Sequence, residues 1–143
     1  GRVVRDGRNV NLAMGSINAM PVDDRCVDVI ACKEVLMYVP DVRGAIAEVH
    51  RVLQPGGKFL CTIGNLHSHK YAVKGRQGDF ASAFGFDEFK SLVEARSFKC
   101  IESFQKGWWI PLPMWLSKTT HQLPITSADE YHNTNFVYCF EAV

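Results

Sequence analysis

The sequence has no long apolar run and almost no excess of charge of one sign. No run approaches the ~20 apolar residues that a membrane-spanning helix needs, and the N-terminal residues lack a signal-peptide core. Lysine and arginine total 16 against 15 for aspartate and glutamate, a net charge of +1 over 143 residues. We therefore expect neither a membrane protein nor a nucleic-acid-binding protein, but one domain with one core.

Cysteine pairs are also missing. The five cysteines are scattered and none stands in a C-x-x-C pair: Cys26, Cys32, Cys61, Cys100 and Cys139. This distribution predicts free thiols in a cytoplasmic protein rather than a disulfide framework. His67 and His69 have no third ligand at a recognisable spacing, so no metal site is predicted.

One β-α-β unit is the strongest pattern in the sequence. Continuous apolar runs over 27–32 and 58–63 predict two parallel strands that are covered on both faces. Between them, 41–53 predicts an amphipathic helix with Asp41 as its N-cap. The proline and glycines of 54–57 end this helix, with Gly57 expected in the left-handed conformation of a C-cap. The helix should bury one apolar stripe, formed by Val42, Ala45, Ile46, Val49, Val52 and Leu53.

Three segments in order carry a family resemblance: 15–29, 34–38 and 48–57. Their sequences are GSINAMPVDDRCVDV, EVLMY and EVHRVLQPGG, and together they resemble the second half of a class I S-adenosylmethionine-dependent methyltransferase. The resemblance implies an α/β fold, a Rossmann-like doubly wound and mostly parallel sheet with an antiparallel last strand. It also implies one partial domain over 1–143, with a cofactor-side half (1–65) and a substrate-side and C-terminal part (66–143).

The front of the family's domain has no counterpart in the sequence. No G-x-G loop precedes Gly15, and there is no room for two strands and a helix ahead of Asn9. We expect 1–8 to be the tail of a helix, 9–14 to be the family's third strand, and the first two strands to be absent. The strand at 27–32 would then expose an edge, which predicts a fragment of a longer protein or a homodimer through that edge.

The resemblance also implies which residues contact the cofactor. It implies S-adenosylmethionine as cofactor, with Gly15, Ser16 and Ile17 in the loop beside the adenine and Cys32 at the end of the central strand. Ser16 stands where the family usually has an acidic residue. A serine can accept the same hydrogen bond, but without a charge.

Substrate-side candidates follow the predicted strands. By resemblance, Glu34 and Tyr38 lie in the loop beneath the transferred methyl group, although a solvated Glu34 and a packed Tyr38 would serve structure alone. His67 is a candidate general base or an ordinary loop histidine. Trp108 and Trp109 open an aromatic, proline-rich segment that either walls an apolar pocket or covers the sheet as a flap, and that should be neither helix nor central strand.

The rest of the chain predicts the end of such a domain. A helix is expected over 86–98 with Asp87 as its cap, followed by strands at 99–105 and 136–143. The implied function is methyl transfer to an unidentified small-molecule or other acceptor, by a fragment that is inactive alone. Two alternatives are a degenerate, non-catalytic assembly module and a nucleotide-binding oxidoreductase, and the missing phosphate-binding glycines disfavour the second.

Overall fold

The structure is a computed structural model that describes residues 2–5, 8–65, 68, 80–109, 122–123 and 133–143. Its elements in chain order are β1 (Arg2–Arg5), β2 (Arg8–Asn11), β3 (Val27–Lys33), the 3₁₀ turn η1 (Leu36–Tyr38), α1 (Val42–Val52), β4 (Leu53–Gly64), α3 (Phe86–Glu94), β5 (Phe98–Trp109), β6 (Gln122–Leu123) and β7 (Asn133–Ala142). No helix in these ranges is long and apolar enough to cross a membrane.

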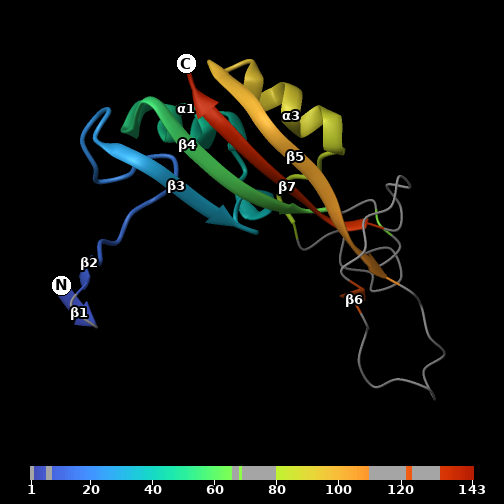
Figure 1. The fold of residues 1–143 in the computed structure, drawn as a ribbon, viewed down its shortest axis with the longest axis horizontal. Coiled ribbons are helices and arrows are strands. Elements are labelled where there is room, and N and C mark those ends of the chain that lie inside the picture. The colour runs from blue at the N-terminus through green and yellow to red at the C-terminus, as the bar shows by residue number, and fades with distance from the viewer. Residues whose placement is uncertain (1, 6–7, 66–67, 69–79, 110–121, 124–132) are drawn as a thin grey trace.

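Five of the described strands form a mixed sheet in the order β3-β4-β7-β5-β6 (Figure 1). β3 and β4 are parallel neighbours, with Ile30 opposite Phe59 and Cys32 opposite Cys61, and α1 connects them. The predicted β-α-β unit is therefore confirmed. The last strand, β7, inserts antiparallel between β4 and β5, as the resemblance implied.

Both helices cover the same face of the sheet (Figure 1). The expected apolar stripe of α1 is buried, and so are alternate residues of β4, namely Phe59, Cys61 and Ile63. The opposite face is open in the described residues, where Val29 is 52% and Leu60 is 43% exposed. The expectation that the strands are covered on both faces is thus wrong for this part of the chain.

The N-cap of α1 was predicted correctly, but its C-terminal end was not. The Asp41 carboxylate accepts the backbone N–H of Gly44 at 2.9 Å. At the other end the chain passes directly into β4 through Leu53, which is extended (φ −72°, ψ 136°). Gly56, not Gly57, has a positive φ of 79°.

Gly57 is required for a different reason, which is close packing. A Cβ atom built there would lie 2.8 Å from the Gln54 carbonyl oxygen and 3.2 Å from that of Asp28. Backbone oxygens cannot move aside cheaply, so the Gln54 carbonyl within β4, supported by that of Asp28 in β3, disfavours a side chain at this position.

The predicted N-terminal elements were wrong. Residues 2–5 form a strand rather than the tail of a helix, and β2 ends at Asn11. β1 and β2 pair antiparallel with each other, with Val3 opposite Val10, and form a sheet of their own. A partner so close in sequence costs little loop-closure entropy, so this local hairpin forms in place of a third strand in the main sheet.

Two boundaries in the C-terminal half also differ. α3 begins at Phe86 with Gly85 as N-cap, and Asp87 lies in its first turn. β5 continues to Trp109, so Trp108 and Trp109 belong to a strand, contrary to the expected irregular segment. Pairing with β7 and β6 on either side extends β5 where propensity alone would stop it.

Gly57→Val should destabilise the chain by about 1–3 kcal/mol, because the added methyl groups meet fixed backbone oxygens. Gly56→Ala is the matched control, since nothing lies within 4 Å of its Cβ position, and it should cost about 1 kcal/mol through its positive φ alone. Urea unfolding monitored by circular dichroism measures both. A near-zero change in the unfolding free energy for Gly57→Val would contradict the close packing around Gly57.

Candidate functional site

The candidate site lies where β3 and β4 end at their carboxyl ends. In an open α/β sheet this edge is where ligands bind, since loops diverge there. Three segments meet at it: the first part of the loop 15–24 that precedes β3, the turn after Cys32, and the start of α1. Asn18 connects the first and third, because its Nδ2 donates to the Asp41 carbonyl oxygen at 2.7 Å.

The loop 15–24 is fixed to α1 by an arrangement that we call the loop clamp, formed by Glu48 and Arg51. Glu48 Oε1 accepts the Met20 N–H at 2.7 Å. Arg51 donates to both Glu48 oxygens at 2.7 and 2.8 Å, and to the Val22 carbonyl oxygen at 2.9 Å. Arg51 also forms an ion pair with Asp24. These bonds hold residues 20–24 of the loop against the C-terminal half of α1.

The hydrogen bonds of the loop clamp shift the pKa values of both Glu48 and Arg51. Hydrogen bonds from Arg51 and from the Met20 N–H lower the pKa of Glu48 from 4.5 to about 2. The same carboxylate, with Asp24, raises the pKa of Arg51. The clamp is therefore fully charged across the physiological range.

The three predicted adenine-side residues lie in this clamped loop. Gly15 is required because a Cβ there would lie 2.7 Å from Pro21 Cδ. Ser16 Oγ accepts the Asn18 N–H at 3.2 Å, so the hydroxyl oxygen is already engaged within the loop. Ile17 is half-buried against the core. A cofactor contact at these residues stays a prediction.

Cys32 lies at the end of β3 and is 8% exposed. Burial raises the pKa of its thiol, which therefore stays protonated and is a poor nucleophile. Any cofactor contact here would come from the backbone of the strand end. No group of three metal-ligating side chains occurs in the part of the chain that the structure describes.

Glu34 is the most constrained polar residue at this edge. Its φ of +53° lies in the left-handed region, a conformation that costs a non-glycine residue of order 1–3 kcal/mol. The Glu34 N–H donates to the carbonyl oxygen of Thr62 at 2.9 Å and to its Oγ1 at 3.1 Å. Asn135 Nδ2 donates to Glu34 Oε1 at 2.7 Å.

Asn135 was missed from the sequence. It lies in β7, 101 residues from Glu34, and reaches it because Gly64 of β4 pairs with Asn135 across the sheet. No local pattern around 133–137 signals this contact, since the segment is otherwise an ordinary alternating strand.

The other substrate-side candidates are spread out. Tyr38 is 57% exposed, and its ring centroid lies 5.2 Å from that of Phe80. Trp108 and Trp109 lie in β5 beyond Lys106, which pairs with Asn135. His67 lies outside the described residues. The structure thus brings together Glu34 and Asn135, with Tyr38 at the next turn of the chain.

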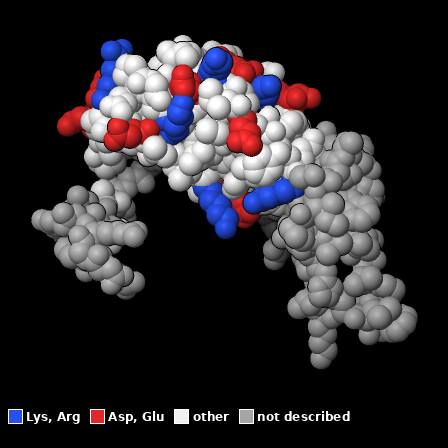
Figure 2. Space-filling model, in the orientation of Figure 1, with Lys and Arg blue, Asp and Glu red and all other residues white. Residues whose placement is uncertain are grey.

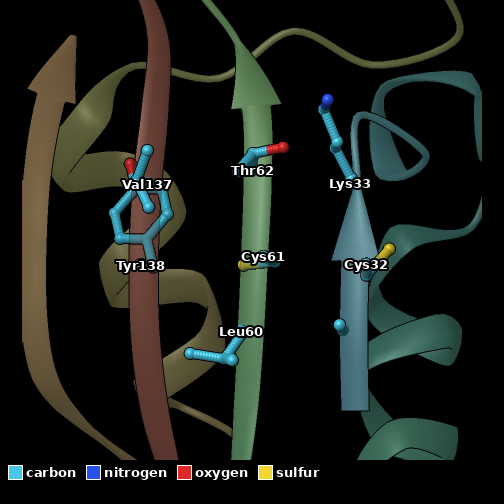
Figure 3. A pocket seen from close by; sticks show the side chains of 8 residues that line it. Cys32, Lys33, Leu60, Cys61, Thr62, Val137 and Tyr138 are labelled. Carbon is cyan, nitrogen blue, oxygen red and sulfur yellow. The ribbon is translucent and has the colours of Figure 1, made fainter.

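Next to this edge the open face of the sheet is hollowed. Figure 3 shows Leu60 and Thr62 of β4 beside Val137 of β7, with Lys33 at the tip of β3. The hollow has a volume of about 280 Å³ and its lining is almost entirely apolar. Figure 2 shows charged side chains of both signs interspersed over this view, rather than a patch of one sign.

Fold and edge together define a Rossmann-like domain of the class I methyltransferase type, present in part. Residues 2–61 match the family described as "Methyltransferase domain". Over 52 residues the chain is 38% identical to a ubiquinone/menaquinone biosynthesis C-methyltransferase, UbiE, of Methylobacterium nodulans, a match that covers 36% of this chain and 21% of that protein.

Solved structures agree on the fold. A chain in the complex of the Haloferax volcanii Trm112 methyltransferase activator with a methyltransferase matches with a TM-score of 0.66 at 20% identity, over 90% of this chain and 59% of that one. The YcgJ protein of Bacillus subtilis matches with a TM-score of 0.64 at 16% identity, over 94% and 72%. The predicted resemblance to class I S-adenosylmethionine-dependent methyltransferases is confirmed, and the structure has the fold of that class in part. Its match spans about a fifth of the length of the curated relative.

Acid should weaken the loop clamp. Because the Glu48 pKa is lowered in the folded chain, its stabilisation is present above about pH 4.5 and is lost as the pH falls towards 2. Glu48→Gln should therefore flatten part of the fall in melting temperature between these pH values. Glu102→Gln, which removes an exposed carboxylate of β5, is the control. An unchanged pH profile for Glu48→Gln would contradict the clamp.

Proposed function

We propose that this chain is the part of an S-adenosylmethionine-dependent methyltransferase that forms the adenine side and the acceptor side of the active site. The observation that carries this proposal is the parallel β3-α1-β4 crossover within the matched family segment. It brings the end of β3, Glu34 and, through the Asn18–Asp41 hydrogen bond, the first part of the loop 15–24 to one edge. The methyl acceptor is an unidentified small molecule or other nucleophile.

The residues present fit one part of the cofactor. The loop at Gly15–Ile17 is rigidly held and offers backbone groups beside a half-buried apolar side chain, which suits a flat, apolar and hydrogen-bonding adenine. The sequence has no G-x-G loop ahead of Gly15, so these residues alone do not enclose the ribose and the amino-acid group.

Methyl transfer requires mainly that the protein hold the two reactants in the right position. When bound, S-adenosylmethionine supplies an electrophilic methyl group on a sulfonium, and transfer depends on holding the nucleophile in line with it. In this chain Glu34 is the polar side chain fixed at the acceptor side. The hollow over Leu60 and Val137 offers an apolar surface beside it. A cytoplasmic location belongs to the same proposal, because all five cysteines are free thiols.

A second candidate is an assembly module without catalysis. β3 is an edge strand of the described sheet and carries an exposed Val29, which is the type of edge that pairs with another chain. On this reading the clamped loop and the Glu34 turn serve folding alone.

The 143-residue chain alone should bind S-adenosylmethionine weakly or not at all in calorimetric titration, because no residue present replaces the glycine-rich loop. An extended polypeptide from the same reading frame with a strand and G-x-G loop ahead of Gly1 should bind it and release S-adenosylhomocysteine when amine, phenol and thiol acceptors are supplied. Micromolar or tighter binding by the 143-residue chain would contradict this division of the site. Failure of the extended polypeptide to bind would favour the assembly module.

If the edge strand β3 pairs with that of a second copy, the chain should be a homodimer. Sedimentation velocity measures this. Val29→Lys should convert it to a monomer, because a charge on an edge strand blocks strand addition. Leu60→Lys is the matched control, since Leu60 is comparably exposed but lies on the central strand β4. A monomer at all concentrations would overturn the dimer.

A further inference from the structure

Glu34 and Asn135 form a polar pair in which one partner has an unused acceptor. Asn135 is 8% exposed, and its Oδ1 is buried with no hydrogen-bond partner. A buried amide oxygen is normally satisfied, and each exception in a folded protein requires an explanation. Here the exception lies beside an exposed carboxylate at the ligand-binding edge of the sheet.

The orientation of the Asn135 amide follows from chemistry. An ionised carboxylate can only accept hydrogen bonds, so the amide must present its NH₂ group to Glu34 Oε1. Its Oδ1 therefore remains an acceptor. The pair therefore has more acceptors than donors, and the second oxygen of Glu34 is the one open to a ligand, because Asn135 Oδ1 is buried.

Glu34 is held in place at a cost in conformational energy. Its left-handed backbone is held by two hydrogen bonds to Thr62, and its side chain by Asn135, so three strands contribute to its position. Strained backbone of this type persists only where the surroundings fix it, and it is concentrated at ligand-binding sites.

We propose that Glu34 and Asn135 form a subsite for an N–H donor, with Glu34 as the residue that contacts the ligand and Asn135 as the residue that positions it. The ligand chemistry is an amine or ammonium group. Two sources would supply it: an amine methyl acceptor or the ammonium of the cofactor's amino-acid group. The identity of the source rests on the proposed function, but the subsite itself does not.

An acceptor amine would use the subsite directly. Its N–H would donate to the free oxygen of Glu34, which orients the nitrogen lone pair away from the carboxylate. For a neutral amine, the new N–C bond would form as the S–CH₃ bond of S-adenosylmethionine breaks and S-adenosylhomocysteine leaves. The N–H proton would pass to the Glu34 carboxylate, so that the methylated product leaves as a neutral amine.

The test is a titration of the isotope-labelled 143-residue chain with methylammonium chloride, followed by nuclear magnetic resonance. The expected result is a saturable shift of the Asn135 side-chain NH₂ signals and of the Glu34 carboxyl carbon. Tetramethylammonium chloride, a cation without N–H groups, should bind roughly tenfold more weakly or not at all. Equal responses to the two cations, or no response to methylammonium, would overturn the subsite.

Variants separate contact from positioning. Glu34→Gln should abolish the methylammonium response with backbone spectra otherwise unchanged, and Glu102→Gln should leave it intact. Asn135→Leu should weaken the response while the Glu34 carboxyl signal moves, because the carboxylate loses its fixed partner. A methylammonium response that survives Glu34→Gln would overturn the proposal.

Competition identifies the source. In the extended polypeptide, S-adenosylhomocysteine, which carries an ammonium, should displace methylammonium if the donor is the cofactor's, whereas 5′-methylthioadenosine, which lacks the amino-acid group, should not. If neither displaces it, the donor belongs to the acceptor. Failure of the extended polypeptide to transfer methyl groups would remove the proposed function, yet would leave the methylammonium result standing.

Discussion

Parallel pairing of β3 with β4 is the constraint on which the rest of this structure depends. Two parallel strands need a crossover, and α1 supplies it along one face of the sheet. Because the two strands point the same way, their carboxyl ends coincide, and the turn containing Glu34 leaves the sheet beside Thr62. The close approach at Gly57 is part of the same pairing, since a side chain there would push β3 away.

The loop clamp fixes the loop before β3 against the helix of this scaffold. Glu48 and Arg51 lie outside the apolar stripe of α1, and they hold the loop before β3 through backbone groups as well as through charge. A loop held by its backbone is positioned regardless of its own side chains. The first part of the same loop is tied to the start of α1 by the hydrogen bond from Asn18 to the Asp41 carbonyl oxygen, and Glu34 is fixed independently by β4 and β7.

Local patterns predicted the parts of this structure that are local. The buried stripe of α1, its Asp41 cap and the two parallel strands follow from spacing and propensity within about 40 residues. The wrong predictions concern segments whose structure depends on which strand they pair with. β5 extends through Trp109 because β7 and β6 flank it, and 2–11 forms a hairpin because each strand finds its partner nearby. Asn135 has no signature in the sequence, since its role exists only once β7 has inserted beside β4.

The central claim is that Gly15–Ile17 and Glu34 share one edge of a parallel β3–β4 pair. The most direct measurement is a set of nuclear Overhauser contacts in the labelled chain. The account predicts interstrand contacts in the register of Ile30 with Phe59 and Cys32 with Cys61, together with contacts between Asn18 and Asp41. Contacts in which Val27 lies near Ile63 and Cys32 near Lys58 would indicate antiparallel strands and would contradict both the family assignment and the site built on it.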